Sequence, residues 1–243
     1  MIPGDSHGIR DFFEDLSRDI TPVPVRHAAH VLYAPVSKDP EVTKRCASVL
    51  SWAEQQRAER FRLSADRSLF IQRRAFRRFC GALSLGSSQL LSRIVFEETE
   101  KGRPYLSDRS DLWFSFSSCS LGFLGAWSSR CEIGVDIEDR TRNPGAIELA
   151  RQYFSVAEVS AIESRGDLNS VEPFFKFWTL KEAALKSIGE GLPFGLNAFE
   201  FELDPHLRIV QAPSGYGGSE KFSAHVIDGL KACTAMVVRN FDD

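Results

Sequence analysis

The most regular hydrophobic pattern in the chain lies near the start of its last third, where large apolar side chains recur at helical spacing. Residues three and four apart on a helix are neighbours, so one side gathers these residues: Phe174, Phe177, Trp178, Leu185 and Ile188. Thr179, Glu182 and Lys186 fall together on another side. Pro173 suits the front of a helix, and the glycines that follow offer a stop. The pattern predicts a long helix with a polar face, although a Glu–Lys pair four apart is by itself usually a solvated surface pair.

A second long helix is predicted from about residue 65 to 83, where the apolar positions are Leu69, Phe70, Phe76 and Phe79. Between residues 57 and 78 the chain holds eight arginines and two acids, which is its only strong charge bias. Two interpretations stay open here. One is a solvated helix face, and the other is an anion site, because arginine presents a planar fork that matches phosphate oxygens. Nucleic acid competes as the anion, but the aromatic residues sit at core spacing and not as a stacking platform.

Shorter segments predict strands at 30–34, 94–96, 113–120, 121–127, 133–139, 199–203, 207–210, 222–227 and 234–238. Residues 41–62 are expected to be partly helical, with Leu50 and Trp52 facing inward. Ser155 and Glu158 form a capping box for a further helix. This order predicts an α+β fold with two pseudo-symmetric subdomains, residues 1–127 and 128–243, each a small, mostly antiparallel sheet packed on a long helix. No sequence repeat is visible, so internal duplication is only suggested.

Two acids, Asp136 and Glu138, alternate with apolar residues in the strand predicted at 133–139. Side chains at i and i+2 share one face of a strand, so the two carboxylates stand side by side while the apolar residues face a core. Such a pair repels itself and needs a cation or a proton nearby. Oxygen ligands suit Mg²⁺, which commonly bridges to substrate phosphates. The alternative is an exposed edge strand with solvated acids.

Composition narrows the classes of function. With 43% hydrophobic and 26% charged residues, the chain is typical of an ordinary globular protein. Its net charge of −3 argues against a nucleic-acid or membrane-surface role for the whole protein. No apolar run is long enough to span a bilayer, and acids interrupt the N-terminal region where a signal peptide needs an apolar core. Five widely spaced cysteines without a C-x-x-C pattern indicate reduced thiols in a cytoplasmic protein.

Four stretches, taken in order, form a pattern: Gly102-Arg103-Pro104, Phe-Ser-Phe-Ser at 114–117, Gly-Val-Asp-Ile-Glu at 134–138, and W-x-x-K-E-x-x-x-K at 178–186. Over about residues 54–192 the chain resembles the 4′-phosphopantetheinyl transferase family, in its longer, monomeric form with two pseudo-symmetric halves. The resemblance implies transfer of the phosphopantetheine arm of coenzyme A, the co-substrate, to a carrier-protein serine, which leaves adenosine 3′,5′-bisphosphate. It also implies that the N-terminal half binds the coenzyme and that the C-terminal half carries the metal-binding carboxylates.

The resemblance assigns roles position by position. Asp136, Glu138 and Glu182 match the carboxylates that bind Mg²⁺, or alternatively Mn²⁺. Lys186 matches the lysine on the transferring phosphate, so Glu182 and Lys186 are the expected catalytic pair. The expected contacts to coenzyme A, of which Arg57 would meet the 3′-phosphate, are Arg57, Arg103, Pro104, Ser115, Ser117, Ser118, Asp136 and Lys186.

Two positions depart from the family pattern. Arg103 stands where the Gly-Lys-Pro turn usually has lysine, which keeps the charge but alters the geometry. Ser118 stands where a histidine usually follows the serine. It can donate a hydrogen bond to phosphate but brings no positive charge, so a weaker grip on coenzyme A or an altered donor preference is expected. Arg57, Arg60 or Arg74 would compensate for the positive charge that is missing at Ser118.

Phosphoryl transfer mainly needs charge neutralisation and positioning. Because ligand pockets usually lie in clefts between subdomains, the metal and the coenzyme are expected in the cleft between the halves. The serine proton would pass to Glu182 or to a water molecule on the metal, and the sequence does not choose. The expected partners are acyl, peptidyl or aryl carrier proteins, which the basic surface near Arg73 and Arg77 would attract. No binding to nucleic acid or to a membrane is expected, and the chain is expected to be monomeric. Two alternatives stay open: another Mg²⁺-dependent phosphate-ester enzyme, or an arginine-rich module that binds nucleic acid or another anion.

Overall fold

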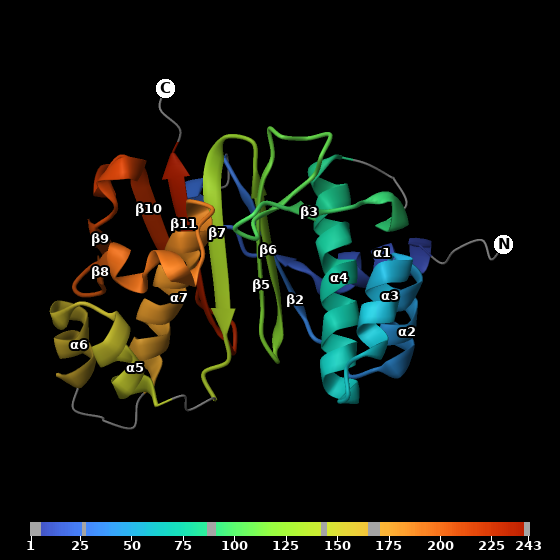
Figure 1. Cartoon of the computed structure of the whole chain (residues 1–243), viewed down its shortest axis with the longest axis horizontal. Coiled ribbons are helices and arrows are strands. Elements are labelled where there is room, and N and C mark those ends of the chain that lie inside the picture. Colours follow the sequence, from blue (N-terminus) through green and yellow to red (C-terminus); the bar gives the residue numbers. More distant parts are fainter. Residues whose placement is uncertain (1–5, 26–27, 87–90, 142–144, 165–170, 241–243) are drawn as a thin grey trace.

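Two small antiparallel sheets lie side by side in the middle of the molecule, with α1–α4 on one outer side and α5–α7 on the other (Figure 1). The computed structural model describes residues 6–25, 28–86, 91–141, 145–164 and 171–240. The mixture of small antiparallel sheets with long helices confirms the predicted α+β class. Within these residues, no helix combines the length and the apolar character needed to cross a membrane.

The first sheet is antiparallel throughout and is covered by helices from the N-terminal half. Its strand order is β1 (Arg18–Asp19), β2 (His30–Pro35), β6 (Gly122–Ser128) and β5 (Trp113–Ser118). The helices on its outer side are α1 (Ser6–Leu16), α2 (Pro40–Ser48), α3 (Trp52–Glu59) and α4 (Ser64–Ser84). Every residue of β6 is buried, because α4 covers one face of the sheet and the second sheet covers the other. This explains why β6 reads as an almost continuous apolar run.

The second sheet has the order β10 (Phe222–Val226), β11 (Cys233–Asn240) and β7 (Cys131–Glu138), and α7 (Glu172–Ser187) packs on it. The other elements of this half are α5 (Ala146–Tyr153), α6 (Val156–Glu163), and a short ribbon of β8 (Glu200–Glu202) with β9 (Arg208–Gln211). The apolar residues of β7 fill the layer between the sheets, together with residues such as Leu124 and Met236. The expected boundary at residue 127 falls one residue before the end of β6, and the division into two subdomains stays a prediction.

The edge strands β5 and β7 of the two sheets meet along a seam that positions the site. The indole nitrogen of Trp113 donates to the carbonyl oxygen of Ile133 at 3.0 Å. Farther along, the backbone nitrogen of Val135 donates to the hydroxyl oxygen of Ser115 at 3.1 Å. Side-chain hydrogen bonds therefore join the halves where the two polar motifs run next to each other.

Three local expectations are wrong. Residues 94–96 form no strand: Ile94 packs beside Gly81 of α4, and Phe96 packs on the aromatic rings of β5. The strand begins later, as the short β3 (Glu97–Glu98), which pairs with β4 (Pro104–Tyr105). Trp52 is 77% exposed, because it begins the first turn of α3 after the Ser51 cap, whereas Leu50 is buried as expected. Thr179 does not share a polar face but is fully buried, and its hydroxyl donates to the carbonyl oxygen of Phe175.

The capping box of α6 is confirmed, and it belongs to a buried ion pair that the pattern did not reveal. Glu158 caps through Ser155 and also contacts Lys181 of α7, with 2.8 Å between the carboxylate oxygen and the ammonium nitrogen. Both side chains are fully buried. Lys181 donates further to the carbonyl oxygens of Leu196 and Phe199, so its charge is completely hydrogen-bonded. The pair ties α6, α7 and the segment leading into β8 together.

Replacing Lys181 by methionine is expected to destabilise the fold by about 3 kcal/mol, because the Glu158 carboxylate would stay buried without its counter-charge. Chemical denaturation followed by circular dichroism measures the change. Lys176→Met is the matched control, since Lys176 is on the same helix and pairs with the half-exposed Glu172. Equal stability of the two variants would contradict a structural role for the buried pair.

Candidate active site

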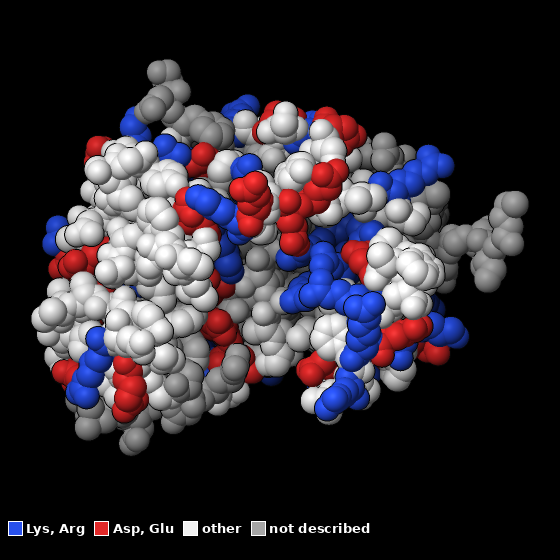
Figure 2. Space-filling model, in the orientation of Figure 1, with Lys and Arg blue, Asp and Glu red and all other residues white. Residues whose placement is uncertain are grey.

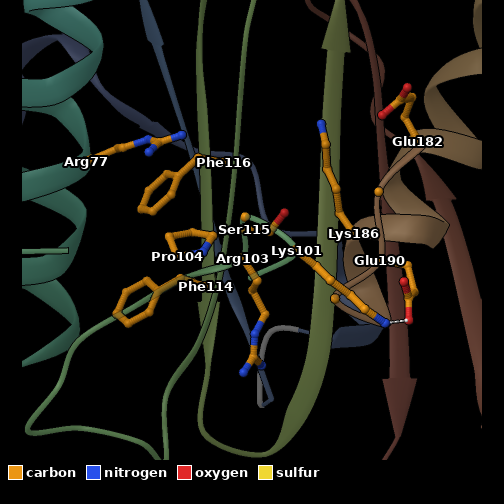
Figure 3. A pocket seen from close by; sticks show the side chains of 13 residues that line it. Arg77, Lys101, Arg103, Pro104, Phe114, Ser115, Phe116, Glu182, Lys186 and Glu190 are labelled. Carbon is orange, nitrogen blue, oxygen red and sulfur yellow. Dashed lines mark hydrogen bonds and ion pairs between the residues drawn. The ribbon is translucent and has the colours of Figure 1, made fainter. Parts of the chain in front are cut away.

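A cavity of about 190 Å³ opens beside the seam of β5 and β7, and α7 forms its other side (Figure 3). Its lining combines four positive side chains, two carboxylates and two aromatic rings. The lining residues are Arg77, Lys101, Gly102, Arg103, Pro104, Phe114, Ser115, Phe116, Glu182, Lys186, Gly189, Glu190 and Gly191. The cavity therefore joins the Gly-Arg-Pro turn and the aromatic–serine strand, which are close in the sequence, to the α7 motif, which lies far from both.

Asp136 lies next to this cavity on β7 and is only 3% exposed. Its Oδ1 accepts hydrogen bonds from the ammonium group of Lys186 at 2.6 Å and from the hydroxyl of Ser117 at 2.7 Å. Lys186 also donates to the oxygen of Ser117 at 3.2 Å. The other carboxylate oxygen, Oδ2, is buried and has no hydrogen-bond partner among the residues that the structure describes. An orphaned carboxylate oxygen in a polar site has the chemistry of a cation ligand.

Glu182 is on α7, one helical turn before Lys186, and it lines the cavity. Burial raises the pKa of Glu182, the nearby Lys186 lowers it, and the charge of Asp136 raises it again. The two carboxylates thus interact, as neighbouring metal ligands would. Glu138, the third expected ligand, is half-buried at the end of β7 and does not line the cavity.

The metal site itself stays a prediction. Within the part of the chain that the structure describes, no three acidic, histidine or cysteine side chains are already gathered as a metal cluster. Asp136 instead takes Lys186 as its positive partner. The orphaned Oδ2 of Asp136 and the neighbouring Glu182 nevertheless fit a bound cation.

Positive side chains face the carboxylates from the N-terminal half. The guanidinium of Arg103 lies 3.7 Å from the ring centre of Trp113, and that of Arg77 lies 5.2 Å from the ring centre of Phe116. Burial and the charges of Arg74 and Arg73 lower the pKa of Arg77 to about 10. Figure 3 shows Arg77 reaching from α4 toward Phe116. These cations give the cavity the charge that a phosphate ligand requires.

The arginine-rich helix also borders a second hollow of about 350 Å³, lined by Ser51, Glu54, Arg74, Arg77, Arg78, Val95, Phe96 and Glu98. Arg78 forms two hydrogen bonds with Glu54, and Arg77 forms one with Glu98. Arg78 is 5% exposed, so a fully solvated helix face is wrong for this residue. Figure 2 shows the arginine-rich surface beside the hollow between the halves.

The expected site residues fall into three groups. The cavity lining includes Arg103, Pro104, Ser115, Glu182 and Lys186. Asp136 and Ser117 lie beside it through their hydrogen bonds to Lys186. Arg57, Ser118 and Glu138 are not in its lining; Arg57 lies over the ring of Phe70 instead.

Sequence reasoning did not assign Lys101, Arg77 or Glu190 to the cavity. Lys101 directly precedes the Gly-Arg-Pro turn, so its neighbourhood was a usable signal. Arg77 stands within the arginine-rich stretch, but only the packing of α4 distinguishes it from the other arginines there. Nothing in the sequence marks Glu190, because its role depends on contacts with both halves.

The sequence of this chain is similar to those of known proteins. Residues 132–234 match a family model described as the 4′-phosphopantetheinyl transferase superfamily. The chain is 33% identical over 153 residues to the putative 4′-phosphopantetheinyl transferase slr0495 of Synechocystis, a match that covers 62% of this chain and 61% of that protein. It is 32% identical over 125 residues to a 4′-phosphopantetheinyl transferase of Bacillus subtilis, covering 51% of this chain and 54% of the relative.

A third relative, the 4′-phosphopantetheinyl transferase HetI of Nostoc, is 30% identical over 179 residues. This match covers 72% of the chain and 74% of HetI. The first two matches thus span little more than half of each relative, whereas the match to HetI includes most of both proteins. The region matched by the family model contains Asp136, Glu138, Glu182 and Lys186.

Proposed function

Because the chain belongs to the 4′-phosphopantetheinyl transferase superfamily, we propose that it transfers the 4′-phosphopantetheine group of coenzyme A to a serine of an apo acyl, peptidyl or aryl carrier protein. The other product is adenosine 3′,5′-bisphosphate. Residues 1–127 would bind most of the coenzyme, and residues 128–243 would supply the carboxylates and Lys186. The protein would act as a cytoplasmic monomer.

One observation carries the proposal: the buried Asp136 contacts Lys186 and keeps one orphaned oxygen, beside Glu182 and a cavity lined by positive side chains. Opposite charges arranged in this way suit a diphosphate and the cation that accompanies it. Asp136, Glu182 and Glu138 would hold Mg²⁺ or Mn²⁺. When bound, that ion supplies charge neutralisation for the diphosphate of coenzyme A.

The remaining roles follow from the positions of the side chains. In the transfer, the serine oxygen bonds to the phosphorus that carries pantetheine, and the bond from that phosphorus to the bridging oxygen breaks. Lys186 is placed to stabilise charge on the transferred phosphate. Glu182, whose raised pKa makes it a stronger proton acceptor, is our candidate for receiving the serine proton. Arg103 and Arg77 line the cavity for the anionic donor.

Intact-mass spectrometry of apo carrier proteins incubated with this protein, coenzyme A and Mg²⁺ tests the reaction. We expect a mass gain of one phosphopantetheine that disappears with EDTA and with Glu182→Ala. Release of inorganic phosphate from simple esters without carrier modification would favour another phosphate enzyme. Steeply salt-dependent binding of nucleic acid that does not need Asp136 would favour the binding module.

Ser118 gives a further prediction within the same assay. Ser118→His is expected to lower the KM for coenzyme A by roughly fivefold, because it adds a hydrogen bond that becomes charge-assisted when the imidazole is protonated. Ser120→His is the positional control on the other side of Cys119. If Ser118→His leaves the KM unchanged, the position has no part in holding the donor.

A further inference from the structure

Three polar side chains join the two halves at the rim of the cavity. The ammonium group of Lys101 lies 2.5 Å from Oε1 of Glu190, and the hydroxyl of Tyr216 donates to the same oxygen at 2.8 Å. Lys101 belongs to the turn between β3 and β4, whereas Glu190 and Tyr216 belong to the C-terminal half. Figure 3 shows Lys101 extended across the cavity to Glu190. We call these three residues the rim cluster.

Glu190 is the firmly placed member of the rim cluster. Helix α7 ends at Ser187, and Gly189 follows with φ of +71°, the left-handed conformation that ends many helices. The backbone nitrogen of Glu190 then donates to the carbonyl oxygen of Leu185 at 2.9 Å. The side chain of Glu190 is only 10% exposed, compared with 60% for Lys101. Its carboxylate is therefore held close to the end of the helix that carries Glu182 and Lys186.

Tyr216 supports the carboxylate from the same half. Arg239 of β11 donates through Nε to the carbonyl oxygen of Tyr216 at 2.8 Å, and its guanidinium lies 5.3 Å from the centre of the tyrosine ring. Arg239 also pairs with Glu132 of β7 at 2.6 Å. The position of Glu190 is thus set by both the end of α7 and the second sheet.

The turn at residues 99–103, on the other side of the contact between Lys101 and Glu190, is held mainly by hydrogen bonds within the turn. Gly102 donates to the carbonyl oxygen of Thr99, Arg103 donates to the hydroxyl oxygen of Thr99, and Thr99 donates back to the carbonyl oxygen of Arg103. Its ribbon, β3 with β4, has only two residues in each strand. Such a small unit needs outside contacts to keep one position. Arg103 provides one outside contact, because its guanidinium lies over the ring of Trp113, and Lys101 provides a second through its ion pair with Glu190.

We propose that Glu190 is a positioning residue that holds the turn at 99–103, and with it Arg103, against the cavity. The effect on substrate rests on the proposed function: a loosened turn would weaken the binding of the diphosphate donor. The transfer step itself should change little, because Asp136, Glu182 and Lys186 have other hydrogen-bond and charge partners. Glu190 would therefore act on the affinity for coenzyme A and not on the chemistry.

Kinetics with coenzyme A separates these two effects. In Glu190→Gln and in Lys101→Met we expect the KM for coenzyme A to rise roughly fivefold while kcat stays within twofold. Glu163→Gln is the matched control, because it removes a carboxylate from a 2.6 Å ion pair with Arg151 on the other side of the C-terminal half. The exchange Lys101→Glu with Glu190→Lys should return the KM toward the wild-type value. An unchanged KM in Glu190→Gln, or a fall in kcat and melting temperature without a change in KM, would overturn the proposal.

Hydrogen exchange on the ligand-free protein tests the positioning without using the reaction. The amides of Gly102 and Arg103 should exchange several-fold faster in Glu190→Gln than in wild type or Glu163→Gln, because they belong to the turn that Glu190 restrains. Equal exchange in all three proteins would contradict the positioning role. If no carrier protein is modified even by the wild type, the proposed function fails, and the exchange rates still decide whether Glu190 holds the turn.

Discussion

Replacing Gly134 by alanine is expected to destabilise the protein by about 4 kcal/mol or more, although only one methyl group is added. A side-chain carbon at this position would overlap the carbonyl oxygen of Ala183 and lie 2.5 Å from the backbone nitrogen of Ser187. Overpacking usually costs about 1–3 kcal/mol because side chains move aside. Here the obstacle is the backbone of α7, which has no rotamer to change, so the strand and the helix would have to separate.

Thermal and chemical denaturation measure this effect, which corresponds to a fall in melting temperature of about 8 °C or more for a chain of this size. Gly215→Ala is the matched control, because a side-chain carbon placed there meets no atom within 4 Å among the described residues beyond its two chain neighbours. We expect Gly215→Ala to melt close to the wild type. A Gly134→Ala protein of normal stability would mean that α7 does not lie against β7 in the way described.

The second large effect is expected on turnover. Asp136→Asn should lower kcat/KM by roughly a thousandfold, about 4 kcal/mol, because it removes the charge that pairs with Lys186 and would hold a cation. The amide oxygen can still accept a hydrogen bond from Ser117, so the fold should persist. Asp136→Ala removes this contact as well and should also lose nearly all turnover.

Initial rates of carrier modification, followed by intact mass, measure the loss. Asp111→Asn is the control, since Asp111 forms an exposed pair with Arg109, and such pairs contribute little. Unchanged melting temperatures would assign the loss of activity to the site itself. An Asp136→Asn enzyme with a near-normal rate would refute the assignment of Asp136.

Both predictions concern one short motif, and they separate what its residues do. Gly134 and Asp136 alternate with buried apolar residues of β7, so the glycine and the acid lie on the face toward α7. The glycine lets the helix come close, and that approach brings Lys186 within 2.6 Å of Asp136. The stability of the contact and the geometry of the site thus have the same origin.

Local patterns in the sequence were sufficient where an interaction involves neighbours along the chain. Helical periodicity located α4 and α7, and alternation located β5 and β7. The capping box of α6 is formed as expected, because all of its hydrogen bonds join residues three apart. The motif residues Arg103, Ser115, Glu182 and Lys186, which the resemblance assigned to the site, line one cavity, and their roles stay a prediction.

The tertiary structure decided what depends on residues distant in the sequence. The amphipathic pattern placed Thr179 with Glu182 and Lys186, but α7 is buried on more than one side, so Thr179 is enclosed. Lys181 and Glu158 look like ordinary charged residues until packing removes both from water and pairs them. Glu190 acquires Lys101 as a partner only when the turn at 99–103 meets the end of α7, and Tyr216 only when the segment between β9 and β10 packs against that end. The sequence by itself determined the two long helices, most of the strands and the chemistry available, because these depend on periodicity and residue type. Which charges face one another was decided only by the packing of the two halves, because electrostatic contacts depend on distances in space that no local pattern contains.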